Sequence, residues 1–149
     1  MALLSAIAQA PIRQDLAVTG SINQYGQIQA VGGVNEKIEG FFATCKSKGL
    51  TGTQGVVIPK SNIHNLMLRE EVIEAVRAGQ FHIWPIENVE EGLSLLSSLE
   101  TGKLQDDGCY PIGTLNYLIS SRLMEFSRIM EQKAAGEDRL TKQNDVEME

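Results

Sequence analysis

The sequence is poor in the residues that build metal centres and disulfide frameworks. Its 149 residues include two cysteines, Cys45 and Cys109, and two histidines, His64 and His82. No CxxC pair occurs, and neither histidine lies near a cysteine. This spacing argues against a structural zinc site. It favours a protein with free thiols, and it leaves a single disulfide open.

The sequence also lacks a long apolar run and an excess of basic residues. No stretch reaches the length of a membrane span, and the apolar start MALLSAIAQAPIR has no basic segment before it, as a signal peptide would. The formal net charge of −6 argues against a broad nucleic-acid-binding surface. A Walker-type phosphate loop is absent from the sequence. We therefore expect a cytoplasmic protein without a membrane or nucleic-acid partner and without a cofactor or metal bound by these residues.

Alternating strand and helix patterns predict one domain of the α/β (α+β) class. A β-hairpin is expected between Leu16 and Val31, with LAVTGSI and QIQAV as its strands and a turn at residues 24–26. The other expected elements are a helix that ends at Pro11, a helix over Val34–Lys48 closed by Gly49, a buried strand at 55–59, a helical turn at 62–68, a helix at 70–78, a strand at 81–86, a helix at 88–99 capped by Asn88, a loop at 100–113 and a long helix at 114–135.

The chain is expected to begin inside a helix, because only Met1 precedes the apolar pattern of Leu3, Leu4, Ile7 and Ala8 and no capping residue stands before it. The predicted organisation is a main domain over residues 1–102, a loop and C-terminal helix over 103–135, and a charged tail over 136–149. We expect the tail to be mobile or weakly helical.

Lys37 is the candidate for chemistry that the local pattern supports best. At about 100° per residue it lies at the edge of the apolar stripe formed by Val34, Ile38, Phe41 and Cys45, in the first turn of the predicted helix. Partial burial and the helix N-terminus both disfavour an ammonium group there, which is what a lysine general base requires. The spacing alone more often indicates a lysine whose stem covers apolar surface and whose charge extends into water.

The stretches DLAVTGSINQYGQIQAVGGVNEK and GVVIP, together with the preceding ALLSAIAQAPIR, resemble the proteolytic domain of Lon proteases over roughly the first hundred residues. The shared pattern consists of Asp15, the Thr19–Gly20 pair, the Gly32–Gly33 pair and Lys37. The later FHIWPIENVEEGLSLL is similar to the end of that domain. The segment GLTGTQGVVIP is more similar in sequence to Lon-like homologues than to the classical bacterial enzyme.

The resemblance implies a serine endopeptidase with a Ser–Lys dyad, in which Lys37 matches the catalytic lysine. It implies that the serine belongs upstream of Met1, so this fragment is expected to be inactive alone. It also implies polypeptide substrates, a homo-oligomer that is a hexameric ring in the family, and an upstream ATPase domain through which any ATP would act. Ser5 does not match the nucleophile and is interpreted as a packing residue.

Two other functions are open at this point. One is a non-catalytic Lon-like module used for assembly, as in some DNA-repair ATPases; Lys37 and the acidic charge count against it. The other is an anion- or nucleotide-binding site at the Gly32–Gly33 helix start. The remaining polar candidates are interpreted as turn, strand or solvated residues: Thr19, Ser21, His64, His82 and the pair Asp106–Asp107.

Overall fold

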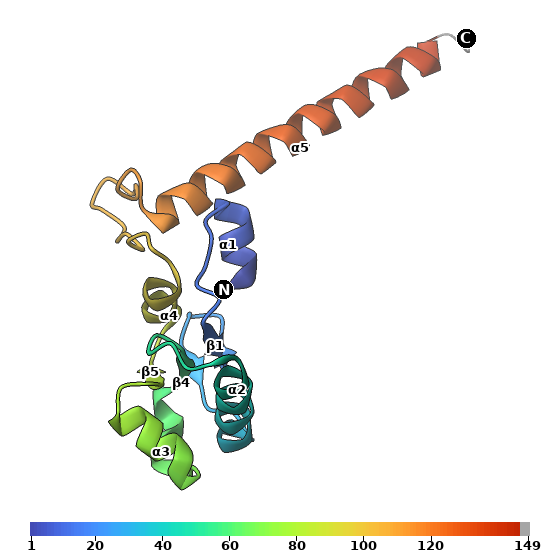
Figure 1. Ribbon diagram of the computed structural model, residues 1–149. Helices are drawn as coiled ribbons and strands as arrows, with labels where there is room; N and C mark the ends of the chain where they lie inside the picture. The colour runs from blue at the N-terminus through green and yellow to red at the C-terminus, as the bar shows by residue number, and fades with distance from the viewer. Residues whose placement is uncertain (147–149) are drawn as a thin grey trace. The chain divides into compact units, whose positions relative to one another are not determined.

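The structure, a computed structural model, describes the backbone of residues 1–146 and the side chains of residues 1–133. The chain forms two compact units (Figure 1). The α/β unit consists of Met1 and residues 11–98, and the helical unit consists of residues 2–10 and the chain from residue 99 onward.

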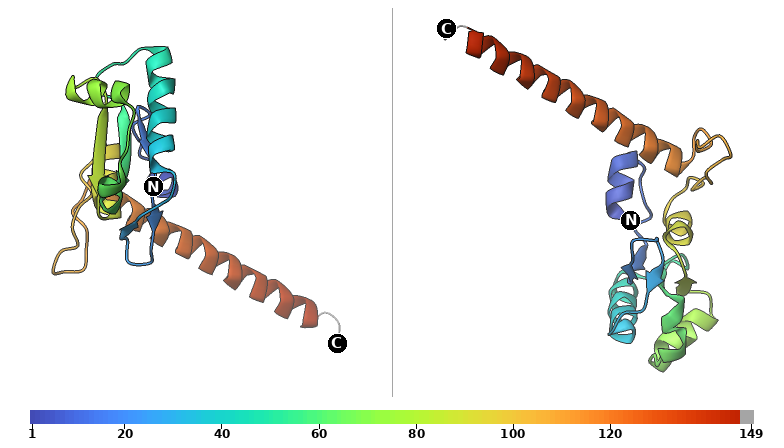
Figure 2. Two further views of the ribbon diagram at one scale, coloured as in Figure 1. Left: turned by 90° about the horizontal axis from the view of Figure 1, so that it is seen from below. Right: turned by 180° about the vertical axis from the view of Figure 1, so that it is seen from behind.

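A parallel sheet of three strands forms the centre of the α/β unit. The strands are β1 (Leu16–Val18), β4 (Gly55–Pro59) and β5 (His82–Ile86), in the order β1-β4-β5. All five residues of the central strand β4 are buried, as expected for a parallel strand covered on both faces. Figure 2 shows β4 and β5 running alongside the helix that connects β1 to β4. The predicted α/β class is confirmed.

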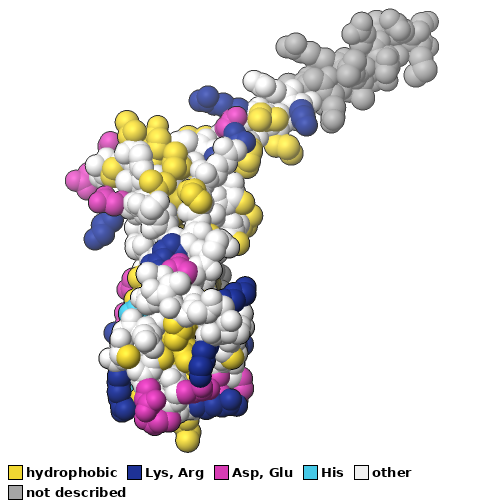
Figure 3. Space-filling model, in the orientation of Figure 1, with side chains coloured by type: hydrophobic (Ala, Val, Ile, Leu, Met, Phe, Trp, Pro, Cys, Tyr) yellow, Lys and Arg dark blue, Asp and Glu magenta, His cyan; other side chains and the backbone are white. Residues whose placement is uncertain are grey.

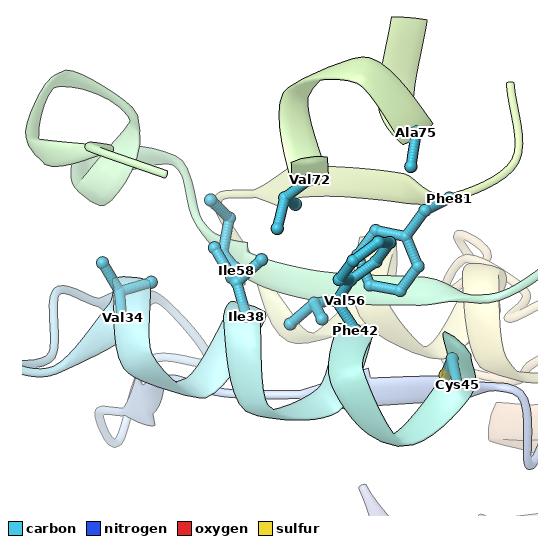
Figure 4. Packing of buried hydrophobic residues seen from close by; sticks show 9 residues of the cluster. All are labelled: Val34, Ile38, Phe42, Cys45, Val56, Ile58, Val72, Ala75 and Phe81. Carbon is cyan, nitrogen blue, oxygen red and sulfur yellow. The ribbon is translucent and has the colours of Figure 1, made fainter. Parts of the chain in front are cut away.

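Successive residues of β4 point to opposite faces of the sheet, and helices cover both of these faces. Val56 and Ile58 contact the core beneath α2 (Val34–Lys48) and α3 (Glu70–Arg77), whereas Val57 faces the cluster that includes Leu96 of α4 (Val89–Leu96). Figure 4 shows the first core, whose members are Val34, Ile38, Phe42, Cys45, Val56, Ile58, Val72, Ala75 and Phe81. The predicted apolar stripe of α2 is therefore its buried face.

The hairpin is present, but its predicted first strand was wrong. LAVTGSI divides at Thr19 and Gly20: β1 joins the parallel sheet, while β2 (Ser21–Ile22) pairs with β3 (Ile28–Gln29) in a separate antiparallel ribbon. The Thr19 amide still bonds to the Val57 carbonyl at 3.0 Å. The chain then leaves the sheet at Gly20, where a Cβ atom would lie 3.2 Å from the Ile28 side chain.

The remaining elements of this unit follow the prediction closely. The helical turn is a 3₁₀-helix, η1 (Lys60–Asn65), which begins directly after β4 and two residues earlier than expected. α2 ends before Gly49, which has the positive φ of 94° that favours glycine. The Asn88 side chain caps α4 by accepting a hydrogen bond from the Glu91 amide at 2.9 Å.

The helical unit contains α1 (Ala2–Ala8) packed against α5 (Leu115–Val146). Ser5 donates a hydrogen bond to the Ala10 carbonyl at 2.6 Å, which closes the end of α1 and agrees with its interpretation as a packing residue. α5 continues beyond the predicted end at residue 135, because helix formers flank Gly136 on both sides. The tail, for which a mobile or a weakly helical state was expected, is helical in its backbone up to Val146, and residues 147–149 lie outside the described part.

Large apolar side chains remain exposed in the helical unit. Figure 3 shows such side chains gathered over the loop before α5 and the start of that helix. They include Leu104, Ile112, Leu123 and Met124, of which Ile112 is 86% exposed. Within residues 1–146, no helix is both long and apolar enough to cross a bilayer.

Candidate functional site

A polar residue follows the carboxyl end of each of the three parallel strands. Thr19 follows β1, Lys60 follows β4 and Glu87 follows β5. α2 starts at the same end, because it belongs to the crossover that returns the chain from β1 to the beginning of β4. In open α/β sheets, ligands bind outside the carboxyl ends of the strands. This edge is therefore where the fold places a site.

Lys37 lies at this edge, in the first turn of α2, and both its backbone and its side chain bond to the preceding glycine pair. Its Nζ donates to the Gly32 carbonyl at 3.2 Å, and its amide donates to the Gly33 carbonyl at 3.2 Å. Gly33 is the N-cap residue and adopts a left-handed conformation with φ of 67° and ψ of 29°. The glycine pair thus supplies both the turn and the partner of the lysine ammonium.

The structure shows the second of the two alternatives for Lys37, because its side chain is exposed and not partly buried. The buried residues of α2 are Val34, Ile38, Phe42 and Cys45, and Lys37 is not among them.

Three side chains that the sequence analysis did not identify hold the start of α2 against the segment after β4. Asn62 bonds twice to the backbone of Val31, at 3.0 Å each. Asn35 donates to the Asn65 carbonyl at 3.2 Å and accepts from the Met67 amide at 3.0 Å.

The third of these side chains, Glu39, accepts from the Arg69 amide at 2.9 Å and pairs with its guanidinium at 3.1 Å. A sequence signal for Asn62 exists: it is an asparagine three residues after the strand GVVIP, at the end of the sheet where sites form.

Two pockets lie at the same edge and share Ile28 and Ile86 as lining residues. The first has a volume of about 210 Å³ and is mainly apolar; it is lined by Met1, Val18, Thr19, Gly20, Ile22, Ile28 and Ile86. The second has a volume of about 500 Å³ and is polar; it is lined by Asn23, Gln27, Ile28, Gln29, Lys60, Ser61, His64, Ile86 and Glu87. Lys37 lines neither pocket. In the polar pocket, the ion pair with Glu87 raises the pKa of Lys60.

The other sequence candidates do not join Lys37. Within the described side chains, no serine or threonine hydroxyl bonds to its Nζ, and the Ser21 hydroxyl is 3.2 Å from Gln29 Oε1. His64 lines the polar pocket, whereas the half-buried His82 lies 2.8 Å from the Gly52 carbonyl at the opposite, amino end of the sheet. Asp107 accepts from the Cys109 amide at 2.9 Å, as a turn residue does.

Asp15, which belongs to the pattern shared with Lon proteases, has a structural position at the amino end of the sheet. It receives two hydrogen bonds from the Arg13 guanidinium, at 2.6 and 3.0 Å, and Arg13 also donates to the Thr53 carbonyl. These hydrogen bonds from Arg13 lower the pKa of Asp15 to about 2. The residue thus fixes the entry to β1 and is remote from Lys37 in the topology.

Among the described residues, no group of three or more histidine, cysteine, aspartate or glutamate side chains is placed so that it could hold a metal ion. Cys45 is buried, Cys109 is exposed, and the two are not bonded to each other.

A comparison with known families decides what this arrangement belongs to. The Lon protease (S16) C-terminal proteolytic domain matches residues 1–98, which is most of the chain and includes the glycine pair, Lys37 and Asn62. The chain belongs to the Lon protease family. The resemblance inferred from the Lys37 segment is thereby confirmed.

Relatives within this family are much longer than the chain. A Lon protease homologue of Escherichia coli (strain K12) is 51% identical over 98 residues, which are 66% of this chain and 17% of the relative. A Lon protease homologue of Haemophilus influenzae is 43% identical over 121 residues, or 81% of this chain and 20% of the relative. An archaeal Lon protease of Thermococcus kodakarensis is 31% identical over 71% of this chain and 14% of its own length. The chain thus spans a fifth or less of these relatives.

Proposed function

We propose that this chain is the lysine-bearing part of a Lon-type serine endopeptidase, with Lys37 as the general base of a Ser–Lys dyad. The observation that carries the proposal is the position of Lys37: it lies at the carboxyl ends of the parallel strands, bonded to a glycine pair, in a member of the Lon family. The nucleophilic serine is proposed to lie in the parent protein, upstream of Met1. The chain alone is then inactive.

In the proposed reaction, neutral Nζ of Lys37 takes the proton from the serine hydroxyl as the serine Oγ attacks the peptide carbonyl carbon. A neutral amine has two N–H groups and one lone pair, so the bond to the Gly32 carbonyl uses one N–H and leaves the lone pair for the serine. The protonated lysine then gives its proton to the departing amine. Water hydrolyses the acyl-enzyme in a second step, with Lys37 again accepting a proton.

The substrate is proposed to be an extended polypeptide that adds a strand to the sheet. Among the described residues, β1 pairs with β4 only, so β1 is an edge strand and no other strand pairs with its second side. The apolar pocket beside Val18, Gly20 and Ile22 borders this edge and suits an uncharged side chain of the bound peptide. Polypeptide binding would then position the scissile bond by backbone pairing, and the pocket would select the side chain.

The parent is further proposed to be a homo-oligomeric ring, hexameric as the family resemblance implies, located in the cytoplasm. An ATPase domain upstream would provide any dependence on ATP. The length of the relatives supports the presence of further domains, because this chain matches a fifth or less of each.

The decisive experiment is the hydrolysis of a fluorogenic peptide and of an unfolded protein by the full-length parent, with and without ATP and Mg²⁺. Lys37→Ala is expected to lower kcat at least about 100-fold, because a general base contributes roughly 10²–10⁴-fold. The matched control is Lys46→Ala, which removes another exposed lysine of α2 that pairs with Glu71 at 2.8 Å. Unchanged activity of Lys37→Ala would refute the assigned base. An inactive parent that still forms oligomers would favour the assembly module instead.

A further inference from the structure

Asn62 is one of few polar side chains buried in the α/β unit, with 3% of its surface exposed. It lies on η1, after the carboxyl end of β4, and bonds twice to a single residue of another segment. Its Oδ1 accepts from the Val31 amide and its Nδ2 donates to the Val31 carbonyl, both at 3.0 Å. A side-chain amide paired with both backbone groups of one residue fixes the position and the orientation of that residue.

Three consecutive carbonyls of the Val31–Gly33 segment are each held by a different donor. The Val31 carbonyl accepts from Asn62, the Gly32 carbonyl from Nζ of Lys37, and the Gly33 carbonyl from the amide of Lys37. Asn62 contributes a fixed point outside this loop, because the other two donors belong to Lys37 itself. Both residues between this fixed point and α2 are glycines, which have the greatest conformational freedom.

We infer that Asn62 is a positioning residue for Lys37, an inference that rests on the proposed function. By holding both backbone groups of Val31, it fixes the two peptide planes that flank Val31 and so the start of the glycine pair, whose Gly32 carbonyl orients the lysine Nζ. When this anchor is lost, the glycine pair can rotate, and the lone pair of Nζ then loses its direction toward the serine. Asn62 does not touch the reacting atoms and acts only through Val31 and Gly32.

The activity test uses the full-length parent with Asn62→Ala and with Asn62→Asp. The aspartate variant keeps the size of the side chain and the acceptor for the Val31 amide, but it replaces the donor with an oxygen that repels the Val31 carbonyl. Both variants are expected to lower kcat by about 100-fold with KM unchanged, because misplacement of a catalytic group by about 1 Å costs roughly that factor. The aspartate variant serves as the test if Asn62→Ala does not fold.

Asn35→Ala is the matched control. Asn35 lies on α2 and also bonds twice to the backbone of the segment after β4, but it makes no hydrogen bond to residues 31–33. Its loss is expected to lower stability while leaving kcat within about twofold. If Asn62 had only the same structural role as Asn35, the variants of both residues would lower stability, and neither would change kcat by more than about twofold.

A second readout uses the 149-residue chain and does not depend on catalysis. The ¹⁵N order parameters of Gly32 and Gly33 are expected to fall from about 0.85 to below about 0.6 in Asn62→Asp and to stay unchanged in Asn35→Ala. Rigid glycines in the variant, or a parent that depends on Lys37 but has an unchanged kcat in Asn62→Asp, would overturn the inference. A parent that is inactive, or is active without Lys37, would instead refute the proposed function, and the inference would fall with it.

Discussion

Replacing Gly33 with alanine is expected to destabilise the α/β unit, whereas the same change at the neighbouring Gly32 is expected to stabilise it slightly. The two glycines form the pair that precedes the helix of Lys37, and they differ in backbone conformation. Gly33 has φ of 67°, in the left-handed region, while the φ of Gly32 is not positive. The two substitutions therefore share their chemistry and differ only in whether the backbone tolerates a Cβ atom.

Two contributions determine how much each substitution changes the free energy of unfolding. A left-handed conformation costs a residue with a Cβ atom about 1–2 kcal/mol. Alanine also reduces the freedom of the unfolded chain, which stabilises the folded state by about 0.4–1 kcal/mol at either position. No steric term is added, because a Cβ at Gly33 would lie 3.6 Å from its nearest neighbour, Glu36 Oε2, and a Cβ at Gly32 would meet nothing within 4 Å. The difference between the two variants therefore isolates the strain, at about 1–2 kcal/mol.

Urea unfolding followed by the fluorescence of Trp84, the one tryptophan of the chain, measures this difference directly. With an m-value of roughly 1.5 kcal/mol/M, the Gly33→Ala midpoint should lie roughly 1 M below that of Gly32→Ala. Equal midpoints, or a lower midpoint for Gly32→Ala, would show that the left-handed turn before α2 is not as described. The geometry proposed for Lys37 would then lose its support as well.

Two further predictions concern stability. The lowered pKa of Asp15 means that its pair with Arg13 stabilises the fold above the usual value of 3.8 and that this contribution is lost as the pH falls toward about 2. Because both side chains are partly exposed, Arg13→Ala should destabilise the fold by only about 1 kcal/mol at pH 7, and by less at pH 2, where the bond from Arg13 to the Thr53 carbonyl remains; equal costs at both pH values would contradict this assignment. Phe81→Ala should lower the free energy of unfolding, measured in urea, by about 3–5 kcal/mol. The Phe81 ring is fully buried and packs edge-on against the Phe42 ring, with 5.2 Å between the ring centroids. A cost below about 1 kcal/mol would contradict the described core.

The sequence predicted elements well where local signals and burial agree. Both ends of α2 were correct because glycines stand at each boundary and one apolar stripe runs between them. β4 was correct because a short apolar run bounded by glycine and proline fits a buried strand. The prediction of LAVTGSI as one strand is wrong, because its β-propensity does not reveal where the strand breaks or which partner each half finds.

The candidate site was predicted only in part, because its geometry depends on segments far apart in the sequence. Lys37 and its glycine pair form one local pattern and could be identified. Asn62 lies 31 residues from the backbone that it holds, so its role requires the fold. The sequence also could not decide between a partly buried and an exposed Lys37, because helical periodicity places a residue at the border of a stripe but does not say how far the neighbouring elements extend.

The exposure of Lys37 leads to a prediction about the 149-residue chain alone. A lysine base needs a fixed position, an oriented Nζ and a hydroxyl partner. Residues 1–133 supply the first two through the glycine pair and Asn62, but none of their hydroxyl groups bonds to Nζ. Peptide hydrolysis by the chain should therefore be no faster than that of its own Lys37→Ala variant, and a fluorophosphonate probe should label no serine. Hydrolysis that disappears in Lys37→Ala, or a labelled Ser21 or Ser61, would show that the nucleophile lies within the chain and would refute its proposed place upstream of Met1.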